Sequence, residues 1–127
     1  MPILRAEPGS DEEEAALATL REGMSAIDAY LRVHGEPGGP FLLGSRWSLA
    51  ETACAPFAQR FASVLPGLRP QLQPRAMLAD GGLAHFSRWL DAVVARPSCV
   101  ETCPPAAELV EGYVKLLERM KAMKAAA

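Results

Sequence analysis

Apolar side chains recur at spacings of three and four residues in four separate parts of the chain. The first stripe follows a capping box that begins at Ser10, and it predicts a helix of about 24 residues that ends near His34. Its members are Leu17, Leu20, Met24, Ile27 and Leu31. Residues 1–9 contain three helix breakers and show no periodicity, so we expect a flexible lead-in there.

A second stripe follows Ser48, which has a glutamate, Glu51, three residues later and therefore matches another capping box. This stripe predicts a helix that ends by Pro66. Pro56 lies inside it and removes one backbone hydrogen bond, so the helix either kinks there or has different boundaries. The apolar members are Leu49, Ala53, Phe57, Phe61 and Val64.

The remaining stripes lie in the second half of the chain. Residues 66–82 are rich in Pro and Gly and predict a loop with one helical turn, and a third helix over 83–94 ends at Arg96-Pro97. A short turn over 98–102 precedes a fourth stripe from Leu109 to Met123. No segment alternates with period two. The sequence therefore predicts an all-α bundle of about four main helices, folded as one domain over residues 10–127.

Composition narrows the classes of partner. The chain has 127 residues, half of them apolar, and a formal net charge of -2. This balance offers no positive field for a polyanion, so we expect no nucleic acid partner. No apolar run approaches the ~20 residues that cross a bilayer, and the first residues lack a basic, apolar leader. We therefore expect a soluble, cytoplasmic protein that does not enter a membrane.

Candidate chemistry is sparse. The three cysteines are an odd number, and Cys54 lies in an apolar helical run where a buried thiol is common. Cys99 and Cys103 are four residues apart, which matches neither a redox pair nor a zinc site, and His34 and His85 complete no metal constellation. We assign no catalytic, cofactor-binding or metal residue, and the role of Cys99 and Cys103 stays open.

Several motifs together resemble the C-terminal helical domain of glutathione transferases. They are GPFLLG at 39–44, WSLAE at 47–51, APFAQRF at 55–61, WL at 89–90 and RPS at 96–98. The resemblance covers residues 12–120. Within the superfamily, the Arg60-Phe61 pair and residues 108–113 are most similar to the omega and lambda classes, which act as thiol transferases and dehydroascorbate reductases.

The resemblance implies that Ser48 and Glu51 are structural, because the family places a capping box at this helix start. Glu51 replaces the usual aspartate of the family. Thr52 stands where the family places the apolar staple partner of Trp47, so we expect the cap to form and the staple to be weak. The resemblance also implies that Pro56 kinks a continuous helix.

The resemblance further concerns the glutathione-binding domain and an additional helix that members of the family have. Its members hold glutathione in a thioredoxin-like N-terminal domain that has no counterpart in these 127 residues, so glutathione is expected only if such a domain is supplied. The family domain also opens with an additional long helix. We therefore expect the stripe of Leu17, Leu20, Met24 and Ile27 to be partner-facing, covered by a second copy or by another protein.

Two functions remain open from the sequence. The chain is either the helical, hydrophobic-substrate half of a glutathione transferase or thiol transferase, inactive alone, or a non-catalytic interaction module like those in translation factors and tRNA-synthetase assemblies. A hydrophobic small molecule is an expected partner in the first case. A helical bundle with neither role is the third alternative.

Overall fold

The computed structural model describes residues 1–126 and contains seven helical segments. A 3-10 turn, η1 (Pro2–Leu4), is followed by α1 (Asp11–His34), α2 (Leu49–Leu68), α3 (Pro74–Asp80), α4 (Ala84–Ala95), α5 (Pro97–Thr102) and α6 (Ala106–Ala126). Within residues 1–126 there is no strand, only two isolated β-bridges in the loop before α2. The predicted all-α class is confirmed.

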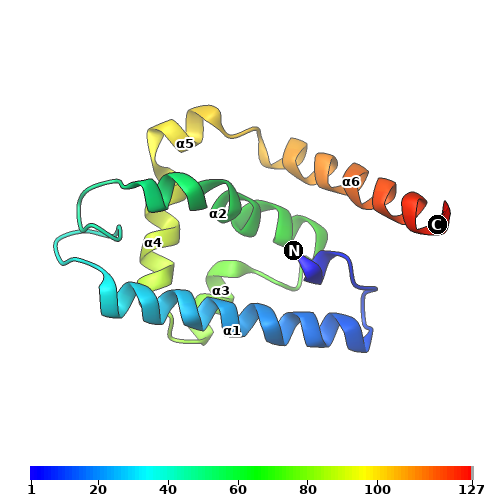
Figure 1. The fold of residues 1–127 in the computed structure, drawn as a ribbon, viewed down its shortest axis with the longest axis horizontal. Helices are drawn as coiled ribbons and strands as arrows, with labels where there is room; N and C mark the ends of the chain where they lie inside the picture. Colours follow the sequence, from blue (N-terminus) through cyan, green and yellow to red (C-terminus); the bar gives the residue numbers. More distant parts are fainter. Residues whose placement is uncertain (127) are drawn as a thin grey trace.

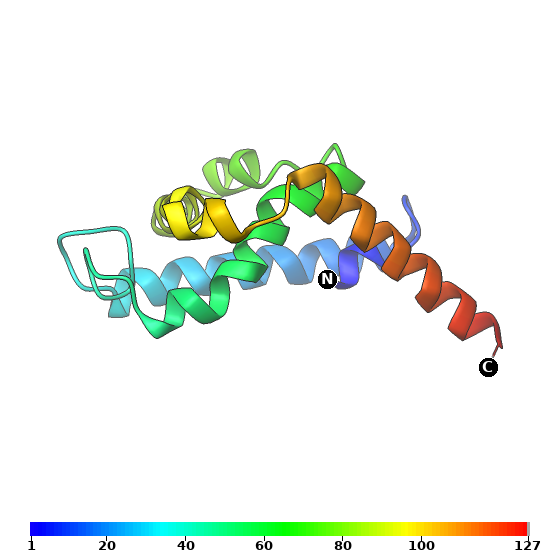
Figure 2. The same cartoon turned by 90° about the horizontal axis from the view of Figure 1, so that it is seen from above.

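Helix α4 lies at the centre of the fold, where it packs against α1, α2, α3 and α5. Helix α1 packs against α4 and η1, and α2 packs against α4 and α6 (Figure 1). Helix α6 starts beside α2 and then runs away from the body, so that its C-terminal end stands apart from the other elements (Figure 2). None of the residues of α6 is fully buried.

The core lies where α2 and α4 meet α1 and η1. Its fully buried side chains include Ile3, Val64, Leu65, Leu90 and Val93. The apolar face that the third stripe predicts on α4 is inside. Removing one such side chain from water stabilises the fold by about 1.5–3 kcal/mol. On α2 only Phe61 and Val64 of the predicted stripe are buried, whereas Leu49 and Phe57 are exposed, so the stripe predicted for this helix was wrong over its first half.

Side-chain caps fix the N-terminal ends of α1 and α4, as well as that of α2. Ser10 Oγ accepts a hydrogen bond from the N–H of Glu13 at 3.1 Å, as its spacing predicts. Helix α4 has no cap from its own N-terminal residue. Instead the buried carboxylate of Asp28, on α1, accepts a hydrogen bond from the N–H of Phe86 at 2.9 Å. Because this bond satisfies a free N–H of the first turn, it also holds α1 against α4.

Residues 1–9 differ from the flexible lead-in that the sequence predicts. Ile3, Leu4 and Ala6 are buried, so this segment belongs to the core. Arg69, which follows α2, donates hydrogen bonds to the carbonyl oxygens of Ala6 at 2.7 Å and Ile3 at 3.4 Å. These partners lie more than 60 positions away in the chain, so no local pattern could reveal them.

Arg69 also pairs with an acid of the first helix. Its Nε lies 2.8 Å from Glu13 Oε2. The N–H of Gly9 and the guanidinium of Arg69 hold the pKa of Glu13 below its ordinary value. Arg69 therefore joins the N-terminal segment, α1 and the end of α2 in one polar cluster.

Helix α2 is longer than predicted. It continues through Pro56 and past Pro66 to Leu68, because the N–H of Arg69 still bonds to the carbonyl of Leu65 at 2.8 Å. A proline removes one helical hydrogen bond and crowds the carbonyl four residues before it, and the packed neighbours of α2 hold the last turn in place despite both effects. The predicted end at Pro66 was wrong.

Two short helices appear where the sequence predicts a loop with one turn and a short turn. Helices α3 and α5 begin with Pro74 and Pro97 in the first helical turn. Proline suits this position because its missing N–H would have no helical partner.

The weak staple that the resemblance implies is replaced by polar contacts. Trp47 Nε1 donates a hydrogen bond to Thr52 Oγ1 at 2.8 Å. The guanidinium of Arg96 stacks 3.9 Å from the centre of the Trp47 ring, and the Phe41 ring lies edge-on at 5.4 Å. Threonine therefore still fixes Trp47 beside the start of α2.

Candidate functional site

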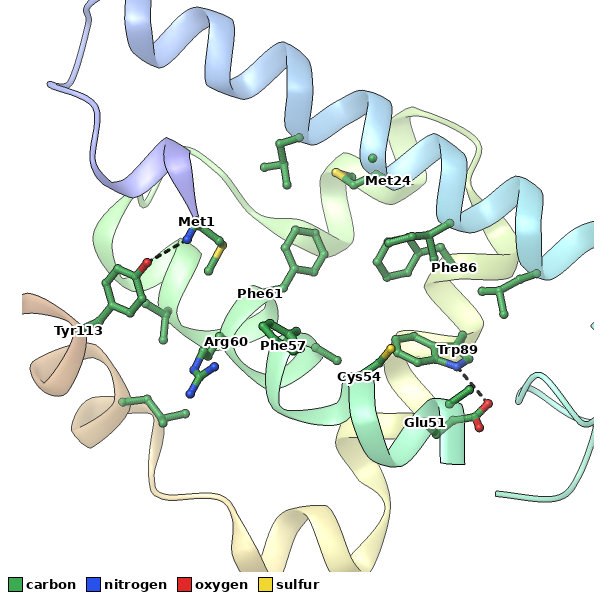
Figure 3. A pocket seen from close by; sticks show the side chains of 18 of the residues that line it. Met1, Met24, Glu51, Cys54, Phe57, Arg60, Phe61, Phe86, Trp89 and Tyr113 are labelled. Carbon is green, nitrogen blue, oxygen red and sulfur yellow. Dashed lines mark hydrogen bonds between the residues drawn. The ribbon is translucent and has the colours of Figure 1, made fainter. Parts of the chain in front are cut away.

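A groove with a volume of about 1110 Å³ lies between α1, α2 and α6. Leu20 and Ile27 line it from α1, Phe57 and Phe61 from α2, and Leu116 from α6. Almost all of its surface is carbon (Figure 3). A groove of this size slightly exceeds the range of about 300–1,000 Å³ for small-molecule sites, and its apolar walls suit a hydrophobic occupant.

Aromatic rings form the floor of the groove. The Phe61 and Phe86 rings lie 5.8 Å apart, and Trp89 meets Phe86 edge-on at 6.1 Å. All three are buried and belong to the core. The floor is therefore held by core packing, and it is pre-formed.

Glu51 closes one end of the groove. Its side chain is 0% exposed, and it accepts hydrogen bonds from the N–H groups of Leu42 at 2.7 Å and Ser48 at 3.1 Å. The Ser48 hydroxyl and Trp89 Nε1, at 3.4 Å, also donate to it. Ser48 and Glu51 thus form the capping box of α2, and Glu51 additionally ties the preceding loop and α4 to that helix.

These donors determine the charge state of Glu51. Burial raises the pKa of this carboxyl, but the hydrogen bonds from the Ser48 side chain and from the N–H groups of Leu42 and Ser48 outweigh burial and hold the pKa below its ordinary value. A carboxylate with this many donors stays ionised and has no oxygen left for a proton transfer. Glu51 is a structural residue, although it lines the groove.

The opposite end of the groove is cationic. The Met1 amine donates a hydrogen bond to Tyr113 Oη at 3.0 Å, and Arg60 projects from α2 beside them (Figure 3). Burial lowers the pKa of this amine, and the charges of Arg5 and Arg60 lower it further. The polar groups of the groove therefore lie at its two ends, with a carboxylate that already has its hydrogen-bond donors at one end and positive charge at the other.

Two helical glycines keep the groove open. Gly23 on α1 and Gly112 on α6 line it, and a Cβ atom at either position would meet nothing within 4 Å. Glycine inside a helix destabilises it by about 1 kcal/mol relative to alanine. At these two positions glycine lowers the stability of the helix, and a larger side chain there would narrow the groove.

The predicted partner-facing stripe of α1 is only partly at the surface. Met24 is a core residue, exposed by 3%, so the expectation that it faces a partner was wrong. Leu17 and Leu20 are half-buried against the core, and Ile27 is 45% exposed. The stripe turns inward because η1 and α4 both pack against α1, with α4 held at Asp28 in the second half of the helix. Leu20, Met24 and Ile27 all line the groove.

The cysteines also differ from expectation. Cys54, predicted to be buried, is exposed and lines the groove from α2, whereas Cys99 is buried and Cys103 half-buried. All three are free thiols. Cys54 lies on the face of α2 that the core leaves uncovered, and the apolar pattern could not show which apolar face remains open. Uncovered apolar residues such as Phe57, 69% exposed, accompany it.

In the part of the chain that the structure covers, no three His, Cys, Asp or Glu side chains come together in a way that could hold a metal ion. Across residues 1–126, no helix combines the length and the apolar character that crossing a bilayer requires.

Comparison with known proteins places the chain in a family. Residues 10–97, more than half of the chain, match the family model described as "Glutathione S-transferase, C-terminal domain". The chain belongs to this family. No curated protein and no solved structure matches the chain significantly.

Membership of the glutathione S-transferase C-terminal domain family confirms the superfamily that the motifs suggested. The match is to the domain as a whole and distinguishes no class within the superfamily. It covers α1 through α4 with the floor of the groove and the Glu51 end. Helix α6, the third wall of the groove, lies outside the matched residues.

Proposed function

We propose that this chain is the hydrophobic-ligand half of a glutathione-transferase-like protein and that it has no catalytic activity alone. The observation that carries the proposal is the groove between α1, α2 and α6, with about 1110 Å³ of space and an almost entirely apolar lining. The open space at Gly23 and Gly112 supports it, because stabilising side chains would fit there in the absence of an occupant.

The proposal also covers the transferase class of the whole protein and its cofactor, glutathione. Arg60-Phe61 and residues 108–113 favour an omega- or lambda-like class, hence a thiol transferase or dehydroascorbate reductase type of activity in the whole protein. Glutathione would be held by a thioredoxin-like domain and not by this groove. Calorimetric titration of glutathione into the 127-residue chain should give no saturable heat, and a micromolar site would contradict this assignment.

Ligand binding is tested with a neutral apolar fluorophore, N-phenyl-1-naphthylamine, and a pair of variants at one position. The wild-type chain should bind the probe saturably. Gly112→Leu should abolish binding because its side chain enters the groove, whereas Gly112→Ala adds only a methyl group and should retain it. Both variants should be more stable than the wild type by up to about 1 kcal/mol, since both raise helix propensity.

This pair separates loss of the groove from loss of the fold. The midpoint temperature of thermal unfolding of both variants should equal or exceed that of the wild type. Absence of saturable binding to the wild type, or unchanged binding to Gly112→Leu, would refute the proposed function.

An interaction module is the second candidate, because large apolar side chains are exposed around the groove. Phe57 on α2 is 69% exposed, Ile27 on α1 and Leu116 on α6 are each 45% exposed, and all three line the groove. Contiguous exposed apolar surface of this kind is typical of sites that another protein chain covers.

Sedimentation velocity tests this candidate with two matched variants of α1. If the groove mediates self-association, Ile27→Asp should shift the chain towards monomer. Val33→Asp places the same charge at an exposed position of the same helix outside the groove and should have no effect. A monomeric wild-type chain, or equal behaviour of both variants, would contradict self-association through this surface.

A further inference from the structure

The cationic end of the groove holds an arginine that no salt bridge of the described residues neutralises. Arg60 lines the groove, and within the described chain it forms no salt bridge. Its nearest aromatic contact is weak, with the guanidinium 5.9 Å from the centre of the Phe57 ring. Glu108 is the one acid other than Glu51 among the residues that line the groove, and it too is absent from the ion pairs of the described chain.

Other groups at this end add hydrogen-bond donors. Figure 3 shows Met1, Tyr113 and Arg60 together at one end of the groove, and Glu51 with Trp89 at the other. Burial and the charges of Arg5 and Arg60 lower the pKa of the Met1 amine, so the two guanidinium groups carry the lasting positive charge of this cluster. Such a cluster is stabilised by an anion, since the anion relieves the mutual repulsion.

The opposite end cannot accept a second polar group. The Glu51 carboxylate is fully buried and already accepts from Leu42, Ser48 and Trp89. Between the two ends the walls are carbon, with Leu20 and Ile27 on α1 facing Phe61 and Phe57 on α2. The groove therefore matches a molecule that has one anionic end and one long apolar part.

We propose that the groove binds a single-chain anionic amphiphile, such as a free fatty carboxylate, with its head group at Arg60 and the Tyr113 hydroxyl and its alkyl chain along Phe61 towards Trp89. This inference rests on the proposed function and names the ligand class of the same site. A guanidinium is well suited to a carboxylate head because it offers paired N–H donors in a planar fork.

Competition against N-phenyl-1-naphthylamine tests the head-group contact. Decanoate and 1-decanol share one chain length and differ in the charge of the head group. Arg60→Gln should weaken displacement by decanoate about five-fold, which corresponds to about 1 kcal/mol for a partly exposed charge pair, and should leave 1-decanol unchanged. The effect on decanoate should shrink in 1 M NaCl because salt screens exposed charges.

Arg21→Gln is the matched control. Arg21 is an exposed arginine on α1 that does not line the groove, so this variant should leave displacement by both ligands unchanged. If decanoate does not displace the probe, if Arg60→Gln affects both ligands equally or neither, or if Arg21→Gln has the same effect, the head-group assignment is wrong. Binding of the neutral probe would still support the proposed function in each of these cases, whereas loss of probe binding to the wild type would remove both.

Discussion

Glu51 offers the sharpest test of how the start of α2 is held, and the substitution is Glu51→Gln. The carboxylate has two oxygens, and donors approach both of them. Oε1 accepts from the N–H of Leu42 at 2.7 Å and from Trp89 Nε1 at 3.4 Å, and Oε2 accepts from Ser48. Glutamine has nearly the same shape but only one oxygen, so its amide N–H₂ must face one set of donors.

The magnitude follows from counting the donors that lose a partner. If the amide oxygen stays at Oε1, the Ser48 N–H is left without an acceptor, and in the other orientation the Leu42 N–H and Trp89 Nε1 lose theirs. A buried donor without a partner costs about 1–3 kcal/mol, and the charge assistance of the remaining bonds is also lost. We therefore expect Glu51→Gln to lower the free energy of unfolding by about 2–4 kcal/mol at pH 7.

Urea denaturation, followed by tryptophan fluorescence, measures this difference. Glu118→Gln, at an exposed position of α6, should change the free energy of unfolding by less than about 0.5 kcal/mol and controls for the lost charge. Equal stability of the wild type and Glu51→Gln at pH 7 would refute the role assigned to this carboxylate.

The same pair of proteins gives a pH dependence with a defined sign. Because the pKa of Glu51 is lower in the folded chain than its ordinary value, its stabilisation is complete above the unfolded pKa of about 4.3 and is lost as the pH falls through the folded pKa. The stability gap between the wild type and Glu51→Gln should stay constant from pH 8 to pH 6 and narrow in acid. Glu13 titrates in both proteins and cancels. A gap that persists unchanged at pH 2 would show that the carboxylate charge is not what the donors stabilise.

Three further substitutions or reactions test the packing. Asp28→Ala should lower the free energy of unfolding by about 1–2 kcal/mol by uncapping α4, while Asp28→Asn keeps an acceptor and should cost less in the same thermal melts. Gly67→Ala should cost about 1–3 kcal/mol and speed tryptic cleavage of α6, since its Cβ would lie 2.5 Å from Val110; unchanged cleavage would contradict this contact. A thiol reagent such as dithiobis-nitrobenzoate should modify Cys54 rapidly and Cys99 only upon unfolding, and equal rates in the native chain would contradict their burial.

The sequence predicted α1 and the start of α2 well because capping boxes and apolar spacings involve residues that are close together in the chain. The stripe after Ser10 and the cap at that residue place α1 at the bounds that the structure shows, and Ser48 does the same for the start of α2. The contacts that assemble these helices are not local. Asp28 caps α4 across 58 positions, and Arg69 holds Ala6 across 63. A single sequence carries no signal for such pairs, since each residue is ordinary in its own neighbourhood.

The groove was predictable only in part. The stripe of α1 suggested an uncovered apolar face, but the pattern could not show that Met24 turns into the core while Ile27 stays at the rim, because both positions lie on the same helical face. The contact between Met1 and Tyr113 spans 112 positions. One available signal was overlooked: Gly23 and Gly112 lie inside otherwise strong helical patterns, where glycine marks a need for space.

The residues around the groove follow a different rule from those of the core. In the core, each apolar side chain is enclosed, and polar groups such as Asp28 and Glu51 have partners. Along the groove, Gly112 weakens its helix, Phe57 exposes most of its ring, and Arg60 forms no salt bridge within the described chain. Each of these three features lowers the stability of the isolated chain, and a substitution at each position could raise that stability without disturbing the core. Departures of this kind, gathered on one surface of an otherwise consistent fold, are expected where a sequence is adapted to bind an occupant.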